Sequence, residues 1–205
     1  MQFLRQQLIL LLAMAVLCGA SARADIVLPS PQTRGGQGVF TALNERHSAT
    51  PGDFPLKNVS RQELSNLLWA ATGQNRSGKG WTVPLAMGNA PYNSIYVLND
   101  SGVYRYHWKL NRLVEIGKKN VKNQVGWQRI VEMAPVVLVF VADGDVKREY
   151  ADIATGAMTQ NVYLAAASMG LEGRFVISLK ENALRQALQL EEKAIPLNLM
   201  LIGKK

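Results

Sequence analysis

The sequence predicts a single α+β domain, and three observations support this prediction. Val136–Ala142 (VVLVFVA) is apolar throughout, which is typical of a strand covered on both faces. A capped amphipathic pattern after Ser60 predicts a helix. Alternating residues on both sides of an Asn-Asp-Ser-Gly turn at 99–102 predict a hairpin. Because helices and strands do not follow a regular βαβ order, we expect an α+β architecture.

The composition is that of an ordinary globular chain. Its 205 residues are 48% apolar and 19% charged, which suits one hydrophobic core. This balance excludes disordered, collagen-like and multi-span membrane classes.

The N-terminus has the pattern of a secretory signal peptide. Arg5 precedes the apolar run Leu8–Cys18, and Ala22-Arg23-Ala24 fits the small-x-small cleavage pattern. The apolar run is too short for a helix that crosses a bilayer core of ~30 Å. We therefore predict a signal peptide over 1–24, cleavage near Ala24, export to the periplasm and no remaining membrane span.

Cleavage changes the charge and the cysteine count. Loss of Arg5 and Arg23 lowers the formal net charge from +8 to +6, and loss of Cys18 leaves no cysteine. Thiol catalysis, cysteine-ligated metals and disulfides are excluded for residues 25–205. The remaining Lys and Arg are spread along the chain, so most are expected to be solvated and no nucleic-acid partner is expected. An anion-binding surface stays open as an alternative.

The elements can be placed in chain order. Residues 25–37 hold two Pro and two Gly and predict an extended N-terminal arm, followed by a domain over 38–205. Ser60 and Glu63 form a capping box for a helix with Leu64, Leu67, Leu68 and Ala71 on one face. The further expected elements are a loop over Gly73–Asn93, strands at Ile95–Leu98, Val103–His107, Val136–Ala142, Arg174–Ser178 and Pro196–Gly203, and helices at Tyr150–Met169, capped by Gly170, and Lys180–Leu188.

Several common catalytic patterns are absent. The segment Gly73–Gly80 resembles a phosphate-binding loop, but it follows a helix and has Gly80 where Ser or Thr should bind magnesium. His47 and His107 are the only histidines, and no metal-ligand spacing occurs, so no metal is expected. No Gly-x-Ser-x-Gly elbow is present.

Five segments in a particular order carry a family resemblance. They are Glu45-Arg46-His47-Ser48, LLWAATGQNR (67–76), GVYRYHWKLNRL (102–113), TQNVYLAAASMGL (159–171) and the terminal LMLIGKK (199–205). From about Phe40 to Lys205 the chain resembles the nitroreductase family of flavin mononucleotide (FMN) oxidoreductases, especially the branch related to azoline dehydrogenases of the thiazole-oxidase type. The resemblance implies a nitroreductase-like fold, with a central, mostly antiparallel sheet flanked by helices. It also implies an intertwined homodimer with FMN at the interface.

The resemblance also implies a set of FMN-binding residues. The phosphate and ribityl chain would be held by Arg46, His47 and Ser48, with Lys204 and Lys205 reaching the phosphate. The segment Pro84–Asn89 would border the ring through Pro84, Ala86 and Asn89. Backbone donors at Ile177 and Ser178 would face flavin N5 and O4, and Arg76 would help neutralise the reduced ring. Thr50, Trp81 and Leu85 depart from the residues usual in the family.

The implied function is an exported FMN-dependent oxidoreductase that transfers a hydride to or from flavin N5. No side-chain acid or base is required, because the flavin carries out the chemistry. The expected partners are a small-molecule substrate, a second copy of the chain, and oxygen or a redox partner as electron acceptor, since reduced nicotinamides are scarce outside the cytoplasm. The alternatives are a flavin-free envelope protein with this fold and a basic surface that binds anionic polymers.

Overall fold

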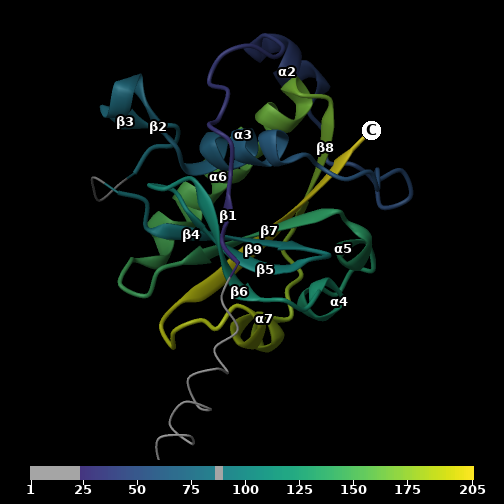
Figure 1. Cartoon of the computed structure of the whole chain (residues 1–205), viewed down its shortest axis with the longest axis vertical. Coiled ribbons are helices and arrows are strands. Elements are labelled where there is room, and N and C mark those ends of the chain that lie inside the picture. The colour runs from purple at the N-terminus through teal and green to yellow at the C-terminus, as the bar shows by residue number, and fades with distance from the viewer. Residues whose placement is uncertain (1–23, 86–89) are drawn as a thin grey trace, which may run out of the picture.

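A computed structural model of the chain describes residues 24–85 and 90–205 (Figure 1). The predicted signal peptide, apart from Ala24, and the predicted FMN contacts Ala86 and Asn89 lie outside the described residues. The helices are α2 (Val39–Glu45), α3 (Arg61–Thr72), α4 (Lys122–Val125), α5 (Ile130–Met133), α6 (Arg148–Ser168) and α7 (Glu181–Ala187). The strands are β1 (Ile26–Val27), β2 (Gln74–Asn75), β3 (Gly80–Trp81), β4 (Asn93–Asn99), β5 (Gly102–His107), β6 (Arg112–Gly117), β7 (Val136–Ala142), β8 (Leu171–Val176) and β9 (Ile195–Lys204).

A seven-stranded sheet forms the centre of the described part of the chain. Its order is β1-β6-β5-β4-β7-β9-β8, and each pair of neighbouring strands is antiparallel. Helices cover both faces of this sheet (Figure 1). The predicted α+β class, with an antiparallel sheet between helices, is confirmed.

The position of β7 in the sheet explains why Val136–Ala142 is apolar at every residue. All seven of its residues are buried between β4 and β9. Val136, Leu138 and Phe140 point into the core under α3 and α6, whereas the alternate residues Val137, Val139 and Val141 point into the core under α4, α5 and α7. Because successive side chains in a strand face opposite sides, a strand between two cores must be apolar at every position.

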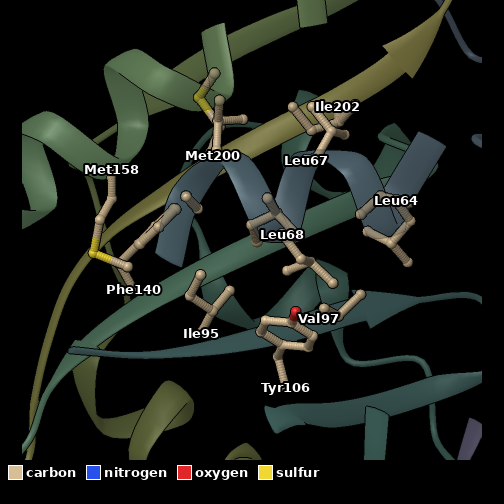
Figure 2. Packing of buried hydrophobic residues seen from close by; sticks show 14 of the residues in the cluster. Leu64, Leu67, Leu68, Ile95, Val97, Tyr106, Phe140, Met158, Met200 and Ile202 are labelled. Atoms are coloured by element: carbon tan, nitrogen blue, oxygen red, sulfur yellow. The ribbon is translucent and has the colours of Figure 1, made fainter. Parts of the chain in front are cut away.

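The helix α3 forms as the sequence predicts. The Ser60 hydroxyl accepts the backbone N–H of Glu63 at 3.2 Å, and the Glu63 carboxylate accepts the N–H of Ser60 at 2.7 Å. The predicted leucines are buried against the sheet and α6, with Leu67 and Leu68 close to Met200, Ile202 and Tyr106 (Figure 2). The packing of α3 on α6 holds both helices on the same face of the sheet.

Two predictions about connections need correction. The hairpin of β4 and β5 continues into β6, because Asn111 takes a left-handed conformation (φ 44°) and closes a turn that lacks glycine. The predicted loop Gly73–Asn93 contains the small hairpin of β2 and β3 around a 3₁₀ turn at Arg76–Gly78. Neither the β5–β6 hairpin nor the β2–β3 hairpin has a two-residue loop with glycine, such as Asn-Gly, which is the usual sequence signal for a hairpin.

The predicted strand Arg174–Ser178 is wrong at both ends. Gly170 (φ 71°) follows α6 as predicted, and β8 begins directly after it at Leu171. The strand ends at Val176, where pairing with Leu199 of β9 stops. Ile177 and Ser178 therefore lie beyond the strand, and the chain next pairs Leu179 with Gly126.

Within residues 24–85 and 90–205, every helix is too short or too polar to cross a lipid bilayer.

Candidate functional site

The segment after α2 lies along the free edge of β8. The helix ends at Arg46, which has an extended conformation, and Ser48 forms a parallel bridge with Gly173 of β8. The Ala49 N–H donates to the Gly173 carbonyl at 3.0 Å. This pairing fixes the predicted residues Arg46, His47 and Ser48 beside the edge strand of the sheet.

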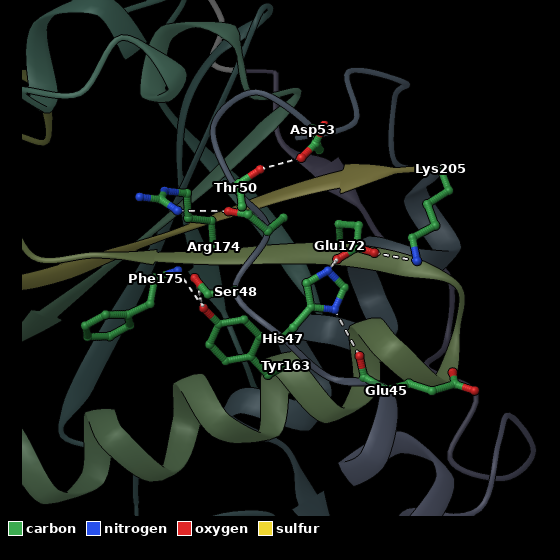
Figure 3. A network of polar contacts seen from close by, with 11 residues as sticks. Glu45, His47, Ser48, Thr50, Asp53, Tyr163, Glu172, Arg174, Phe175 and Lys205 are labelled. Atoms are coloured by element: carbon green, nitrogen blue, oxygen red, sulfur yellow. Dashed lines mark hydrogen bonds and ion pairs between the residues drawn. The ribbon is translucent and has the colours of Figure 1, made fainter.

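Tyr163 of α6 organises the hydroxyl groups at this edge. Its hydroxyl accepts the Phe175 N–H at 2.8 Å and donates to the Ser48 hydroxyl at 3.0 Å (Figure 3). A β-carbon at Gly173 would lie 3.1 Å from the Tyr163 ring and 2.6 Å from the Met200 methyl, so glycine gives the ring room against β8. Since no described residue accepts the Ser48 hydroxyl proton, this hydroxyl can donate to a ligand.

Arg46 provides a second group of available donors. Its guanidinium carbon lies 5.1 Å from the centre of the Tyr163 ring, and the side chain is half-buried. Among the described residues, no carboxylate or carbonyl takes its guanidinium N–H groups. A guanidinium held over an aromatic face keeps its donors in a fixed plane, which suits a phosphate or carboxylate.

A buried carboxylate connects His47 with the C-terminus. The Glu172 side chain is 7% exposed; one oxygen lies 3.1 Å from His47 Nε2 and the other 2.5 Å from Lys205 Nζ (Figure 3). The second nitrogen of the same ring, His47 Nδ1, lies 3.0 Å from the Glu45 carbonyl oxygen. Glu172 therefore places His47 and Lys205 on one side of β8.

Lys204 points to a different partner. Its Nζ donates to the Glu63 carboxylate at 2.8 Å, at the start of α3. Burial raises the pKa of Glu63, but hydrogen bonds from Lys204 and Ser60 and the Lys204 charge outweigh it and hold the pKa below its ordinary 4.5. Lys204 ends β9 and Lys205 follows it, and their side chains take different carboxylates. Of these two lysines, Lys205 joins His47 at Glu172.

Arg174 extends the site along β8. Its Nη1 donates to the Ala49 carbonyl at 2.9 Å, and its Nε and Nη2 donate to Gln128 Oε1 at 3.3 and 3.2 Å. Gln128 Nε2 then reaches the Ser178 hydroxyl at 3.3 Å. The backbone N–H groups of Ile177 and Ser178 donate to no described residue, so these predicted backbone donors are available at the end of β8.

The other described residues of the predicted site lie apart from this edge. Arg76 and Pro84 line a hollow of about 570 Å³ on the segment that carries β2 and β3, which projects from the sheet in Figure 1. Trp81 packs edge-to-face on Trp108, with ring centres 4.9 Å apart, and the Thr50 hydroxyl donates to Asp53 at 2.7 Å. One chain therefore brings Arg46, His47 and Lys205 to one cavity, with Ser48 beside it through Tyr163. Ser178 lies beyond the other end of β8, and Arg76 and Pro84 lie on a different segment.

The cavity beside β8 is small. It has a volume of about 70 Å³ and is lined by Arg46, His47, Tyr163, Glu172 and Lys205, among others. One water occupies about 30 Å³ of liquid, so this space suits a single anionic group, whereas whole ligands occupy pockets of about 300 Å³ or more. The donors present fit a phosphate, and a flavin ring would have to lie outside this cavity.

Sequence reasoning missed four of these residues. Tyr163, Glu172, Arg174 and Gln128 act through partners that are more than ten positions away in the chain. Nothing in local spacing could identify them. Asn161 of α6 has a structural role, because its amide donates to the carbonyls of Ala70 and Thr82 at 3.1 and 2.9 Å.

The part of the chain that the structure describes contains no group of three or more His, Cys, Asp or Glu side chains arranged to hold a metal ion.

Comparisons with known proteins agree on one family. A sequence profile of the nitroreductase family matches residues 45–204. Over 164 residues the chain is 31% identical to a Methanocaldococcus jannaschii protein whose name places it among the nitroreductases, covering 72% of this chain and 82% of that protein.

Solved structures agree with this assignment. A crystal structure from Ralstonia eutropha, titled as a nitroreductase, is 33% identical with a TM-score of 0.79 and covers 91% of each chain. One from Anabaena variabilis, 17% identical with a TM-score of 0.75, covers 90% of this chain and 42% of that one and shows the shared fold. The chain belongs to the nitroreductase family.

Proposed function

We propose that this protein is an exported, FMN-dependent oxidoreductase. The observation that carries the proposal is the half-buried Arg46 guanidinium, which has no acceptor among the described residues and lies beside the donors of Ser48 and Lys205. A family whose members commonly use flavin makes the FMN phosphate the natural acceptor for this cluster.

The donors at the edge of β8 suit a phosphate chemically. Arg46 offers paired N–H donors, which bind two phosphate oxygens at once. The Ser48 hydroxyl accepts a hydrogen bond from the Tyr163 hydroxyl, which accepts one from the Phe175 N–H. This chain of hydrogen bonds polarises the Ser48 hydroxyl as a donor. Lys205 adds positive charge, as does His47 when it is protonated, and the cavity admits one phosphate group.

The end of β8 suits the polar edge of a flavin. The free N–H groups of Ile177 and Ser178 could stabilise negative charge there without depending on side-chain identity. When bound, FMN would supply hydride transfer at its N5. Gln128 and Arg174 hold this segment in place through the Ser178 hydroxyl and the Ala49 carbonyl.

We further propose a homodimer. Arg76 and Pro84 lie on the β2–β3 segment, apart from the phosphate donors. A second copy that laid this segment beside Ile177 and Ser178 would complete a site for the ring. Exposed apolar side chains on α2 support an interface, because Phe40 is 84% exposed beside Val39 and Leu43.

The substrate is proposed to be a small molecule, with oxygen or a redox partner as electron acceptor. The N-terminal signal pattern supports export to the periplasm, where reduced nicotinamides are scarce. Oxidation of a substrate, as in the azoline dehydrogenase branch that the sequence resembles, therefore suits this protein better than reduction at the expense of a nicotinamide.

A spectrum of the purified protein tests the proposal. Protein isolated from the exported fraction should show visible flavin absorbance, or should gain it on addition of FMN followed by gel filtration. Riboflavin, which lacks the phosphate, should be retained less. A colourless protein that takes up no FMN would overturn the oxidoreductase assignment.

Specific features favour a flavin-free binding protein as the second candidate. Thr50 stands where the family has a basic residue, and its hydroxyl already donates a hydrogen bond to the Asp53 carboxylate. Glu172 places a negative charge among the phosphate-binding cations. The same uptake experiment separates the two candidates.

A further inference from the structure

Glu172 is an acidic residue inside the cluster proposed to bind an anion. Its two oxygens contact His47 and Lys205, and its side chain is almost fully buried. We infer that Glu172 is a built-in counter-anion that makes phosphate binding at this site depend on protonation of His47. This inference rests on the proposed function, because it concerns how the site holds a phosphorylated flavin.

A proton on each ring nitrogen of His47 would satisfy both of its contacts. Nδ1 faces the Glu45 carbonyl oxygen at 3.0 Å, and Nε2 faces a Glu172 carboxylate oxygen at 3.1 Å. The Glu45 carbonyl oxygen can only accept a hydrogen bond, and the same holds for the Glu172 oxygen while that carboxylate is ionised. Both nitrogens must therefore donate if both contacts are to be hydrogen bonds. A neutral imidazole has one N–H and could satisfy only one of the two contacts.

The charged groups around His47 come from every neighbouring element. Arg46 and the exposed Glu45 carboxylate lie at the end of α2. Glu172 is on β8, and Lys205 follows β9. Tyr163 of α6 is uncharged. With His47 protonated, His47 and Lys205 both contact the buried Glu172 carboxylate as cations, and Arg46 lines the same cavity. With His47 neutral, two cations remain for Glu172 and an incoming phosphate.

Loss of the His47 proton therefore weakens the site in two ways. It removes one positive charge from the phosphate cluster, and it leaves the buried carboxylate with one fewer donor. Histidine is the side chain that ordinarily changes charge between pH 5 and 8. At high pH, wild type should therefore lose phosphate affinity relative to a variant that lacks His47. The phosphate itself carries more negative charge at high pH in both proteins.

Glu172 has opposite effects before and after the ligand arrives. Without a phosphate, it holds His47 and Lys205 in place on one side of β8. With a phosphate, its negative charge competes for the same cations. Replacing Glu172 with Gln should therefore strengthen phosphate binding and remove the requirement for a charged His47.

The test measures dissociation constants of FMN and riboflavin by flavin fluorescence at pH 5.5 and 8.5. The FMN-to-riboflavin ratio isolates the phosphate contribution. The phosphate ionises with a second pKa near 6, which favours binding at pH 8.5 in every variant. Wild-type protein, H47Q, E172Q and the control H107Q are compared. His107 is the matched control, because its Nδ1 accepts the Leu110 N–H and needs no second proton.

The FMN-to-riboflavin affinity ratio at pH 5.5 is divided by the same ratio at pH 8.5. We expect this quotient to be about fivefold greater in wild type and H107Q than in H47Q, in the range of one ordinary hydrogen bond. E172Q should bind FMN more tightly than wild type at pH 8.5. Equal pH ratios in wild type and H47Q, or weaker FMN binding by folded E172Q, would overturn the inference. If wild type binds no FMN at either pH, the proposed function itself is wrong.

A further variant keeps the test informative if E172Q does not fold. Lys205→Met removes the lysine charge that contacts Glu172 and leaves His47 in place. It should weaken FMN binding by a similar factor at both pH values and preserve the pH ratio of wild type. A K205M protein that lost the pH dependence would contradict the assignment of that dependence to His47.

Discussion

Tyr163 joins α6, β8 and the segment after α2. Its hydroxyl satisfies the Phe175 N–H and polarises the Ser48 hydroxyl, while its ring lies beneath the Arg46 guanidinium. Removing the hydroxyl alone would leave the ring and the cation contact in place. This makes Tyr163 a suitable residue for testing the hydrogen-bond network separately from packing.

We predict that Tyr163→Phe lowers the free energy of unfolding by about 1 kcal/mol, because the Phe175 N–H loses its acceptor. FMN affinity should also fall, since the Ser48 hydroxyl loses the donor that polarises it. Urea denaturation and FMN titration measure the two effects. Tyr150→Phe is the control, because among the described residues the Tyr150 hydroxyl has no hydrogen-bond partner and its ring contacts the Lys147 ammonium. Unchanged stability in Tyr163→Phe would contradict the network.

Glu63 gives a prediction about pH. Its pKa is lowered in the folded protein by Ser60 and Lys204 against the effect of burial. A carboxyl with a lower pKa in the folded state stabilises the fold above its unfolded pKa, and this contribution is lost as the pH falls through the folded value. The contribution should therefore be present at pH 7 and be lost as the pH falls through the lowered pKa of the folded state.

Glu63→Gln measures this contribution. The variant should be about 1 kcal/mol less stable than wild type at pH 7, in the range of a capping interaction, and nearly equal to it at pH 3. Urea denaturation at both pH values provides the comparison. A stability difference that stayed constant with pH would show that ionisation of Glu63 contributes nothing.

Site residues differed in how far the sequence could predict them. Arg46, His47 and Ser48 are consecutive, so one motif identified all three, and the structure places them together. Glu172 and Arg174 could not be identified, because a charged residue in a short strand is normally solvated. Only the folded chain shows that Glu172 is buried between His47 and Lys205.

At the scale of elements, β8 is the strand on which the site depends. It is an edge strand of the described sheet, it receives Ser48 along its free side, and it carries Glu172, Gly173 and Arg174 in succession. At Gly173, Tyr163 of α6 and Met200 of β9 both approach β8 closely. A side chain there must displace either Met200 or Tyr163.

Two glycine substitutions on adjacent elements should have opposite effects. Gly173→Ala should lower the free energy of unfolding by about 1–3 kcal/mol and weaken FMN binding, because the new methyl crowds Tyr163 and Met200. Gly156→Ala, in α6 with nothing within 4 Å of the new methyl, should raise stability by about 0.4–1 kcal/mol. Thermal or urea unfolding distinguishes them, and a Gly173→Ala protein as stable as wild type would contradict the close packing.

The elements that the sequence predicted correctly have strong local signals. The capping box fixed the start of α3, and the run of apolar residues identified β7. By contrast, β6 follows a turn closed by Asn111 rather than glycine, and the end of β8 depends on where β9 stops pairing with it. Such boundaries arise from tertiary contacts, which a single sequence does not display.

At the scale of the whole molecule, the proposed site is divided between two regions. The phosphate donors lie beside β8, whereas Arg76 and Pro84 lie on the projecting β2–β3 segment. The cavity beside β8 is too small for a flavin ring. These observations make assembly of two chains part of the functional proposal.

We predict that the protein without residues 1–24 sediments as a dimer. The double substitution Phe40→Ser and Leu43→Ser should shift it toward monomer, because these α2 side chains are the exposed apolar residues expected at the interface. Leu110→Ser, which changes an exposed leucine in the β5–β6 turn, should leave the dimer intact. Analytical ultracentrifugation measures all three. A wild-type monomer at every concentration would exclude the shared site.

The central claim is that Arg46 anchors the phosphate of a bound FMN. Equilibrium titration with FMN of wild type, Arg46→Ala and the control Arg148→Ala, which removes an exposed arginine at the far end of α6, tests it most directly. The account predicts that Arg46→Ala weakens FMN binding about tenfold or more, in the range of hydrogen bonds to a charged group, while Arg148→Ala binds as wild type. Equal FMN affinity in wild type and Arg46→Ala would contradict it.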